Sequence, residues 1–152
     1  MNHPPANSKP QRILGVDYGL SRIGLALSDE RKIIASPLMT ISAEKKSEET
    51  VRKFLEVIQE LQEKNGYVIE EIVIGLPLLM SGKIGFLADE VNHFVQLLRQ
   101  VLSIPIQTWD ERLTTVQAER SLREGNLSRK KRSKVVDKIS AVIILQSYLN
   151  SK

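Results

Sequence analysis

The chain has 152 residues, a formal net charge of +4 and no cysteine. This length suits one domain that buries roughly two thirds of the surface of its unfolded chain. The lack of cysteine excludes disulfides and thiolate metal sites, and two histidines, His3 and His93, are too few for a histidine-based metal site. We therefore expect any bound metal to have oxygen ligands.

The hydropathy of the chain predicts a soluble, cytoplasmic protein. No stretch approaches the 18 apolar residues of a membrane span, and the N-terminus lacks the apolar core of a signal peptide. Residues 1–11 are polar and rich in proline, so we expect them to be a disordered leader. Residues 12–150 are expected to form the single domain.

The first predicted element is a hairpin that presents Asp17. Two short apolar runs, residues 13–16 and 23–27, flank a turn that contains Gly19. A partly buried carboxylate without a charged partner costs several kcal/mol, and a divalent cation removes that cost. Asp17 is thus either a metal ligand or a turn cap that accepts backbone N–H groups, and the hairpin alone leaves both interpretations open.

The middle of the chain continues with a third strand and then alternates helices with strands. Residues 32–41 are rich in β-forming residues, and Pro37 within them is typical of an edge strand or of a strand end. Residues 47–64 and 86–102 have helical periodicity. The apolar run at 71–76 between them predicts a parallel strand that is buried on both faces.

The C-terminal third begins with a fifth predicted strand, residues 103–109, which runs directly into Asp110 and Glu111. A capping-box pattern at Thr114 predicts a helix from residue 115 to about 124. A basic loop at residues 128–134 should follow, and then a last, largely buried helix at 135–149, whose core at 141–145 is apolar nearly all round.

Positive charge is concentrated in this last third. Residues 112–138 contain nine Lys or Arg and three acidic residues, a local charge of +6, which leaves −2 for the remainder. This asymmetry favours a polyanion-binding face, with nucleic acid as the obvious polyanion, and a solvated basic loop that binds nothing is the alternative.

The predicted order of elements indicates an α/β fold. Three meandering antiparallel strands followed by parallel strands give a mixed five-stranded sheet that is flanked by helices. Binding sites in such sheets lie at the carboxyl ends of the parallel strands.

A third acid, Asp137, lies in the first turns of the last predicted helix and shares a helical face with Ser140, Ala141 and Ile144. Taken alone, it is best explained by stabilisation of the helix dipole. Together with Asp17 and Glu111 it could complete an oxygen-only site, which selects Mg²⁺ or Mn²⁺. Two such ions would clamp a phosphodiester for hydrolysis.

Four motifs in order, at residues 15–26, 73–85, 110–115 and 136–146, carry a resemblance to a known family. The chain resembles the YqgF family, also called RuvX or Holliday junction resolvase-like, within the ribonuclease H-like superfamily. The resemblance implies a ribonuclease H-like fold, nuclease chemistry and a role in maturing the 5′ end of 16S ribosomal RNA. It also implies catalytic and metal-binding roles for Asp17, Glu111 and Asp137.

The second acid of this set is a choice between neighbours. Related resolvases carry it on the strand that here ends at Gly75 and Leu76, so in this chain it must come from Asp110 or Glu111. Successive strand residues point to opposite faces, so only one of the two should reach the metals. We expect Glu111, with Asp110 in reserve.

The basic residues that we expect to contact nucleic acid are Arg22, Arg112, Arg129, Lys130, Lys131, Arg132 and Lys134. The expected partners are pre-16S rRNA or branched DNA, together with ribosomal particles.

Three functional hypotheses remain open at this point. The leading one is a Mg²⁺-dependent endonuclease acting on pre-16S rRNA, with a Holliday junction resolvase as its DNA counterpart. The second is a non-catalytic RNA-binding or ribosome assembly factor that kept the fold. The third takes the first hairpin as the phosphate-binding hairpin of actin-like ATPases, which need two such domains.

Overall fold

The computed structural model describes residues 8–114 and 130–152, and within the last helix it describes side chains from residue 139 onward. The strands are β1 (Gln11–Tyr18), β2 (Arg22–Ser28), β3 (Ala35–Ser42), β4 (Val68–Leu76) and β5 (Ile106–Asp110). The helices are α1 (Ser47–Asn65), α2 (Phe86–Val101), the 3₁₀ turn η1 (Glu111–Leu113) and α4 (Lys130–Asn150). The helix expected at 115–124 lies outside the described residues.

The strands form one sheet in the order β3-β2-β1-β4-β5. The first three strands pair antiparallel, whereas β1, β4 and β5 run parallel to one another. This confirms the predicted mixed sheet, with β3 as an edge strand and Pro37 at an irregularity in its pairing. Because β1, β4 and β5 are parallel, their carboxyl ends meet at one edge of the sheet.

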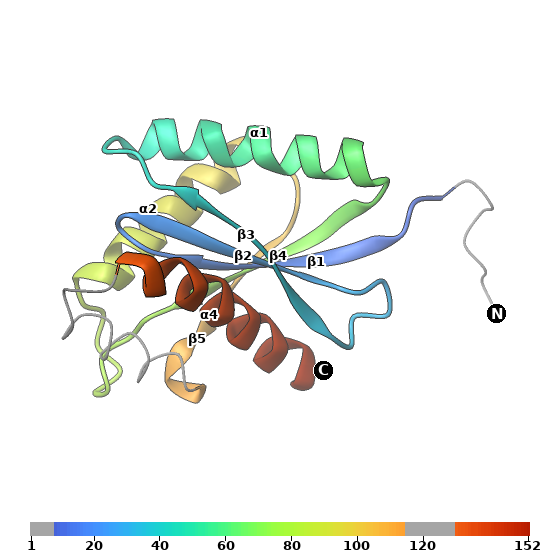
Figure 1. The fold of residues 1–152 in the computed structure, drawn as a ribbon. Coiled ribbons are helices and arrows are strands. Elements are labelled where there is room, and N and C mark those ends of the chain that lie inside the picture. Colours follow the sequence, from blue (N-terminus) through green and yellow to red (C-terminus); the bar gives the residue numbers. More distant parts are fainter. Residues whose placement is uncertain (1–7, 115–129) are drawn as a thin grey trace.

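The sheet is the middle layer of three, with α1 and α2 on one face and α4 on the other (Figure 1). Strand β1 is buried on both faces because its side chains alternate between the layers. Leu14 and Val16 pack into the core that contains Phe54 of α1 and Phe94 of α2, while Ile13 packs beneath α4. The apolar run of β1 therefore belongs to a central strand.

Helix α4 begins at Lys130, earlier than the predicted 135, so the basic run at 130–134 is helical and the expectation of a loop there was wrong. Lys and Arg are good helix formers, and a cluster of like charges does not prevent a helix whose later turns are packed. Asp137 is consequently the eighth residue of α4, whereas it was expected in the first turns. The dipole effect falls off within the first turn, so it no longer explains this acid.

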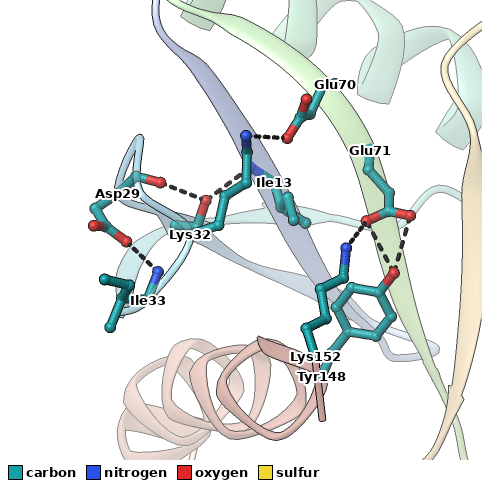
Figure 2. A network of polar contacts seen from close by, with 9 residues as sticks. Ile13, Asp29, Lys32, Ile33, Glu70, Glu71, Tyr148 and Lys152 are labelled. Atoms are coloured by element: carbon teal, nitrogen blue, oxygen red, sulfur yellow. Dashed lines mark hydrogen bonds and ion pairs between the residues drawn. The ribbon is translucent and has the colours of Figure 1, made fainter. Parts of the chain in front are cut away.

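The start of β3 was also placed too early, because residues 29–34 form a turn. Asp29 Oδ1 accepts a hydrogen bond from the Ile33 N–H group at 2.7 Å (Figure 2). It accepts a second from the Ile34 N–H group at 2.9 Å. These bonds hold the pKa of Asp29 below its ordinary value. Lys32 takes a left-handed conformation, with φ of 61°, and its ammonium group pairs with Glu70 at 2.7 Å.

The end of α4 is attached to the sheet through Glu71 of β4. The Tyr148 hydroxyl donates to the Glu71 carboxylate at 3.0 Å, and Lys152 Nζ lies 3.6 Å from the same group (Figure 2). Burial, followed by the neighbouring Glu71, raises the pKa of the Tyr148 hydroxyl.

No helix in the described part of the chain is long and apolar enough to cross a membrane.

The body of α4 lies very close to β1 because position 15 has no side chain. A Cβ on Gly15 would fall 2.6 Å from Leu145 Cβ and 3.2 Å from the Ala141 carbonyl oxygen. Leu145 Cβ is the first atom of a buried side chain, and the Ala141 oxygen belongs to the backbone. Neither atom can move without shifting the helix.

We predict that Gly15→Ala lowers the free energy of unfolding by about 1–3 kcal/mol, because overpacking forces α4 away from the sheet. Chemical denaturation of the purified variant measures this. Gly85→Ala is the matched control, since its Cβ would meet only the flexible end of Leu79, at 3.2 Å. Equal stability of the two variants would contradict the close contact.

Candidate active site

The first acid, Asp17, lies at the carboxyl edge of the sheet on the face that α4 covers. It is the penultimate residue of β1, pairs with Gly24 of β2 and is only 2% exposed. Side chains alternate along a strand, and Gly15 two residues earlier faces α4, so Asp17 faces the same way. The structure therefore buries this carboxylate on the face of the sheet that α4 covers.

The second acid, Glu111, opens the turn η1 directly after β5 and is fully buried. Its carboxylate occupies the space that a side chain on Gly75 of β4 would fill, because a Cβ at this position would clash with Glu111 Oε1. The same Cβ would lie 2.5 Å from Ile144 Cδ1 of α4. Glu111 is thus held between β4 and the helix.

Gly75 separates the two acids and was not recognised as a site residue from the sequence. Strand β4 lies between β1 and β5, and Val16 of β1 pairs with Ile74 of β4. The next residues on these parallel strands, Asp17 and Gly75, therefore lie side by side. Since Gly75 has no side chain, Glu111 can extend over β4 toward Asp17. The available signal was a glycine at the end of a strand that is otherwise rich in isoleucine and valine.

Asp110, the reserve candidate, has a different role from its neighbour. Its Oδ2 accepts a hydrogen bond from Arg112 Nη2 at 2.7 Å, and its Oδ1 accepts from the Arg112 backbone N–H at 3.0 Å. The hydrogen bonds from Arg112 hold the pKa of Asp110 below its ordinary value. The Arg112 side chain, expected to contact nucleic acid, is therefore already engaged with a carboxylate of the same turn.

The path of α4 indicates where the third acid belongs. Along β4, Glu71 meets Tyr148 and Gly75 meets Ile144, so α4 runs antiparallel to the strand. Its earlier turns therefore extend toward the carboxyl edge, and Ser140, one turn before Ile144, is fully buried. Asp137 lies a further turn back along the helix.

The side chain of Asp137 lies outside the part of the chain that the structure describes, so the expected trio is not tested as a whole. Within the described side chains, no three His, Asp or Glu residues are grouped as a metal site.

The expected nucleic-acid contacts are only partly described. Arg22 opens β2 and is half-buried. Arg129 lies outside the described residues, and Lys130, Lys131, Arg132 and Lys134 occupy the first turns of α4 with side chains outside the described part.

The pairing of Asp110 with Arg112 predicts a stability difference that depends on pH. The pKa of Asp110 is lower in the folded state, so the pair stabilises the fold above the ordinary value near 3.8 and loses this effect as pH falls through the lowered pKa. Denaturation should therefore show Asp110→Asn to be less stable than the wild type at pH 7, with a smaller difference at an acidic pH well below 3.8. A difference that is the same at both pH values would contradict this pairing.

Comparison with known proteins places the chain in a family. The sequence model of the RuvX family, described as Holliday junction resolvase, matches residues 11–151. A relative from Protochlamydia amoebophila, named "Putative pre-16S rRNA nuclease", is 72% identical over 95% of this chain and 96% of its own length. A relative of the same name from Clostridium acetobutylicum is 48% identical over 92% of this chain and 98% of its own.

Two solved structures share the fold at low sequence identity. Thermus thermophilus RuvC is similar with a TM-score of 0.51 and 12% identity, covering 92% of this chain and 95% of that one. The fowlpox virus resolvase, solved with a Holliday junction DNA substrate, has a TM-score of 0.51 and 14% identity, covering 92% and 97%. The chain therefore belongs to the RuvX family and has the ribonuclease H-like fold of RuvC.

Proposed function

We propose that this protein is a metal-dependent endonuclease that processes the 5′ end of pre-16S rRNA. The observation that carries this proposal is the pair of buried carboxylates, Asp17 and Glu111, on either side of Gly75 at the carboxyl edge of the sheet. The RNA substrate is supported by the name of the relatives at 72% and 48% identity. Such a substrate implies ribosomal particles as partners and a cytoplasmic location.

The donor set fits a hard divalent cation. Burying carboxylates of like charge beside one another is costly unless positive charge compensates them, and carboxylate oxygens are the ligands that Mg²⁺ and Mn²⁺ prefer. Asp17, Glu111 and Asp137 would hold the ion. When bound, it would supply Lewis-acid stabilisation of the phosphodiester and an activated water.

The protein's own residues account for the remaining requirements. Asp110 stays with Arg112 and leaves Glu111 as the second acid, which supports the choice made from the sequence. The basic residues of the first turns of α4 would hold phosphates that flank the scissile bond. They come just before Asp137 on the same helix, so binding and chemistry share one rigid element.

A second candidate function is resolution of Holliday junctions. The description of the RuvX family model favours it. Both functions use the same acids and the same metal, and they differ in the nucleic acid that the protein holds.

We predict that Asp17→Asn lowers the rate of pre-16S rRNA cleavage by at least about a hundredfold, since it removes a proposed ligand of the ion that would stabilise the transition state. The affinity for Mg²⁺ should fall as well, because the variant lacks one of the proposed carboxylate ligands. A cleavage assay with Mg²⁺ and a calorimetric Mg²⁺ titration measure the two effects. Asp29→Asn, at a carboxylate that caps a turn, is the control and should cleave normally.

Cleavage by Asp17→Asn at the rate of the wild-type protein would overturn the assignment of Asp17 to the active site. Reduced stability with unchanged Mg²⁺ affinity would show instead that Asp17 is a turn cap.

A comparison of substrates separates the candidate functions. We expect cleavage of a pre-16S rRNA 5′ segment, no cleavage of a four-way DNA junction, and loss of activity in EDTA that added Mg²⁺ restores. Preferred cleavage of the junction would favour the resolvase. RNA binding that survives EDTA, without cleavage of either substrate, would favour a non-catalytic assembly factor.

A further inference from the structure

Large apolar side chains are exposed around the carboxyl edge of the sheet. Among the described residues, more than half of the exposed large apolar side chains lie at this edge, either on a connection or on the first residue of α2. We call them the apolar rim: Leu20, Leu79, Met80, Ile84, Phe86 and Leu113.

Two residues of the rim follow candidate acids closely in the chain. Leu20 lies in the β1–β2 turn, three residues after Asp17, and Leu113 follows Glu111 by two residues. Three others lie on the connection from β4 to α2, which begins immediately after Leu76, and Phe86 is the first residue of α2. The rim therefore borders the active site proposed above.

The β4–α2 connection has a defined structure that places its apolar residues outward. The Leu79 N–H donates to the Lys83 carbonyl at 3.0 Å, and the Gly82 N–H donates to the Leu79 carbonyl at 2.7 Å. The Leu79 side chain lies over Gly85. Met80 and Phe86 remain 75% and 69% exposed. A group of exposed apolar side chains beside a site is typical of a binding surface.

The charges near the rim narrow the choice of ligand. Lys83 lies within the connection, and α4, which extends toward this edge, begins with the basic run Lys130, Lys131 and Arg132, while Asp89 is the acidic residue in the first turn of α2. A ligand that matches this combination carries both negative charge and apolar faces. Nucleotides with unpaired bases do so, whereas a duplex stacks its base faces inside and presents mainly phosphates and base edges.

We infer that the apolar rim binds unpaired bases next to the scissile phosphodiester, with Phe86 and Met80 as the main contacts. This inference rests on the proposed nuclease function and specifies its substrate as single-stranded at the cleavage point. Phe86 supplies a flat face on which a base stacks, and such stacking tolerates any base. The rim should thus select strand state rather than base sequence.

The test uses fluorescence anisotropy with a labelled 12-nucleotide RNA, single-stranded or annealed to its complement. All proteins carry Asp17→Asn so that no cleavage occurs. We expect tighter binding of the single strand, and Phe86→Ala should weaken it by about 5- to 100-fold, the range for loss of one stacked base. Met80→Ser should weaken it less, and Phe86→Tyr should preserve it. Duplex binding should be unchanged in all three.

Val101→Ala is the matched control, because Val101 is 56% exposed at the opposite end of α2. It should bind both RNAs as the parent does. Equal weakening of single strand and duplex by Phe86→Ala, or no weakening of either, would overturn the inference.

The outcome does not depend on catalysis. If the chain with native Asp17 failed to cleave RNA while Phe86→Ala still lost single-strand binding, the nuclease proposal would fail and the rim assignment would stand. If the chain with native Asp17 cleaved RNA and Phe86→Ala bound the single strand normally, the nuclease proposal would stand and the rim assignment would fail.

Discussion

The contact between α4 and the sheet depends on two strand positions that have no side chain. Gly15 lets Ala141 and Leu145 approach β1, and Gly75 lets Ile144 and Glu111 share the space above β4. Interiors are packed too densely to absorb an added methyl group at such points without moving an element. These two glycines therefore determine how closely α4 approaches the sheet. They also determine how close the helix comes to the carboxyl edge.

The two ends of α4 meet different surroundings. Near its C-terminus, Tyr148 and Lys152 contact Glu71, while Trp109 of β5 donates to Ser147 at 3.0 Å. Toward its N-terminus, the helix extends past Gly75 to the edge where Asp17 and Glu111 are buried. An α-helix advances by a constant 1.5 Å per residue, so contacts at Tyr148 also set the position of residues two to three turns earlier. A structural anchor and a candidate site are in this way connected through one rigid element.

Asp110 and Glu111 are neighbours in sequence with opposite environments. Asp110 accepts several hydrogen bonds from Arg112 and stays near the surface, whereas Glu111 turns inward over Gly75. The change from strand to 3₁₀ turn between them directs the two side chains apart. A carboxylate with an arginine partner is already neutralised and has little need of a metal, so Glu111 rather than Asp110 is the proposed ligand.

Periodicity and turn residues were sufficient to predict the three antiparallel strands and the parallel strands after them, because these patterns are local, while the carboxyl edge as the site stays a prediction. The motifs also indicated the family and named Asp17 and Glu111. Local patterns could not show that the basic run at 130–134 is helical, since that depends on the packing of later turns of α4. They also could not show that Gly75 makes room for Glu111 or that Asp110 is paired with Arg112. Those features arise only when β1, β4, β5 and α4 are brought together, because each is a contact between side chains and backbone that the chain order alone does not place.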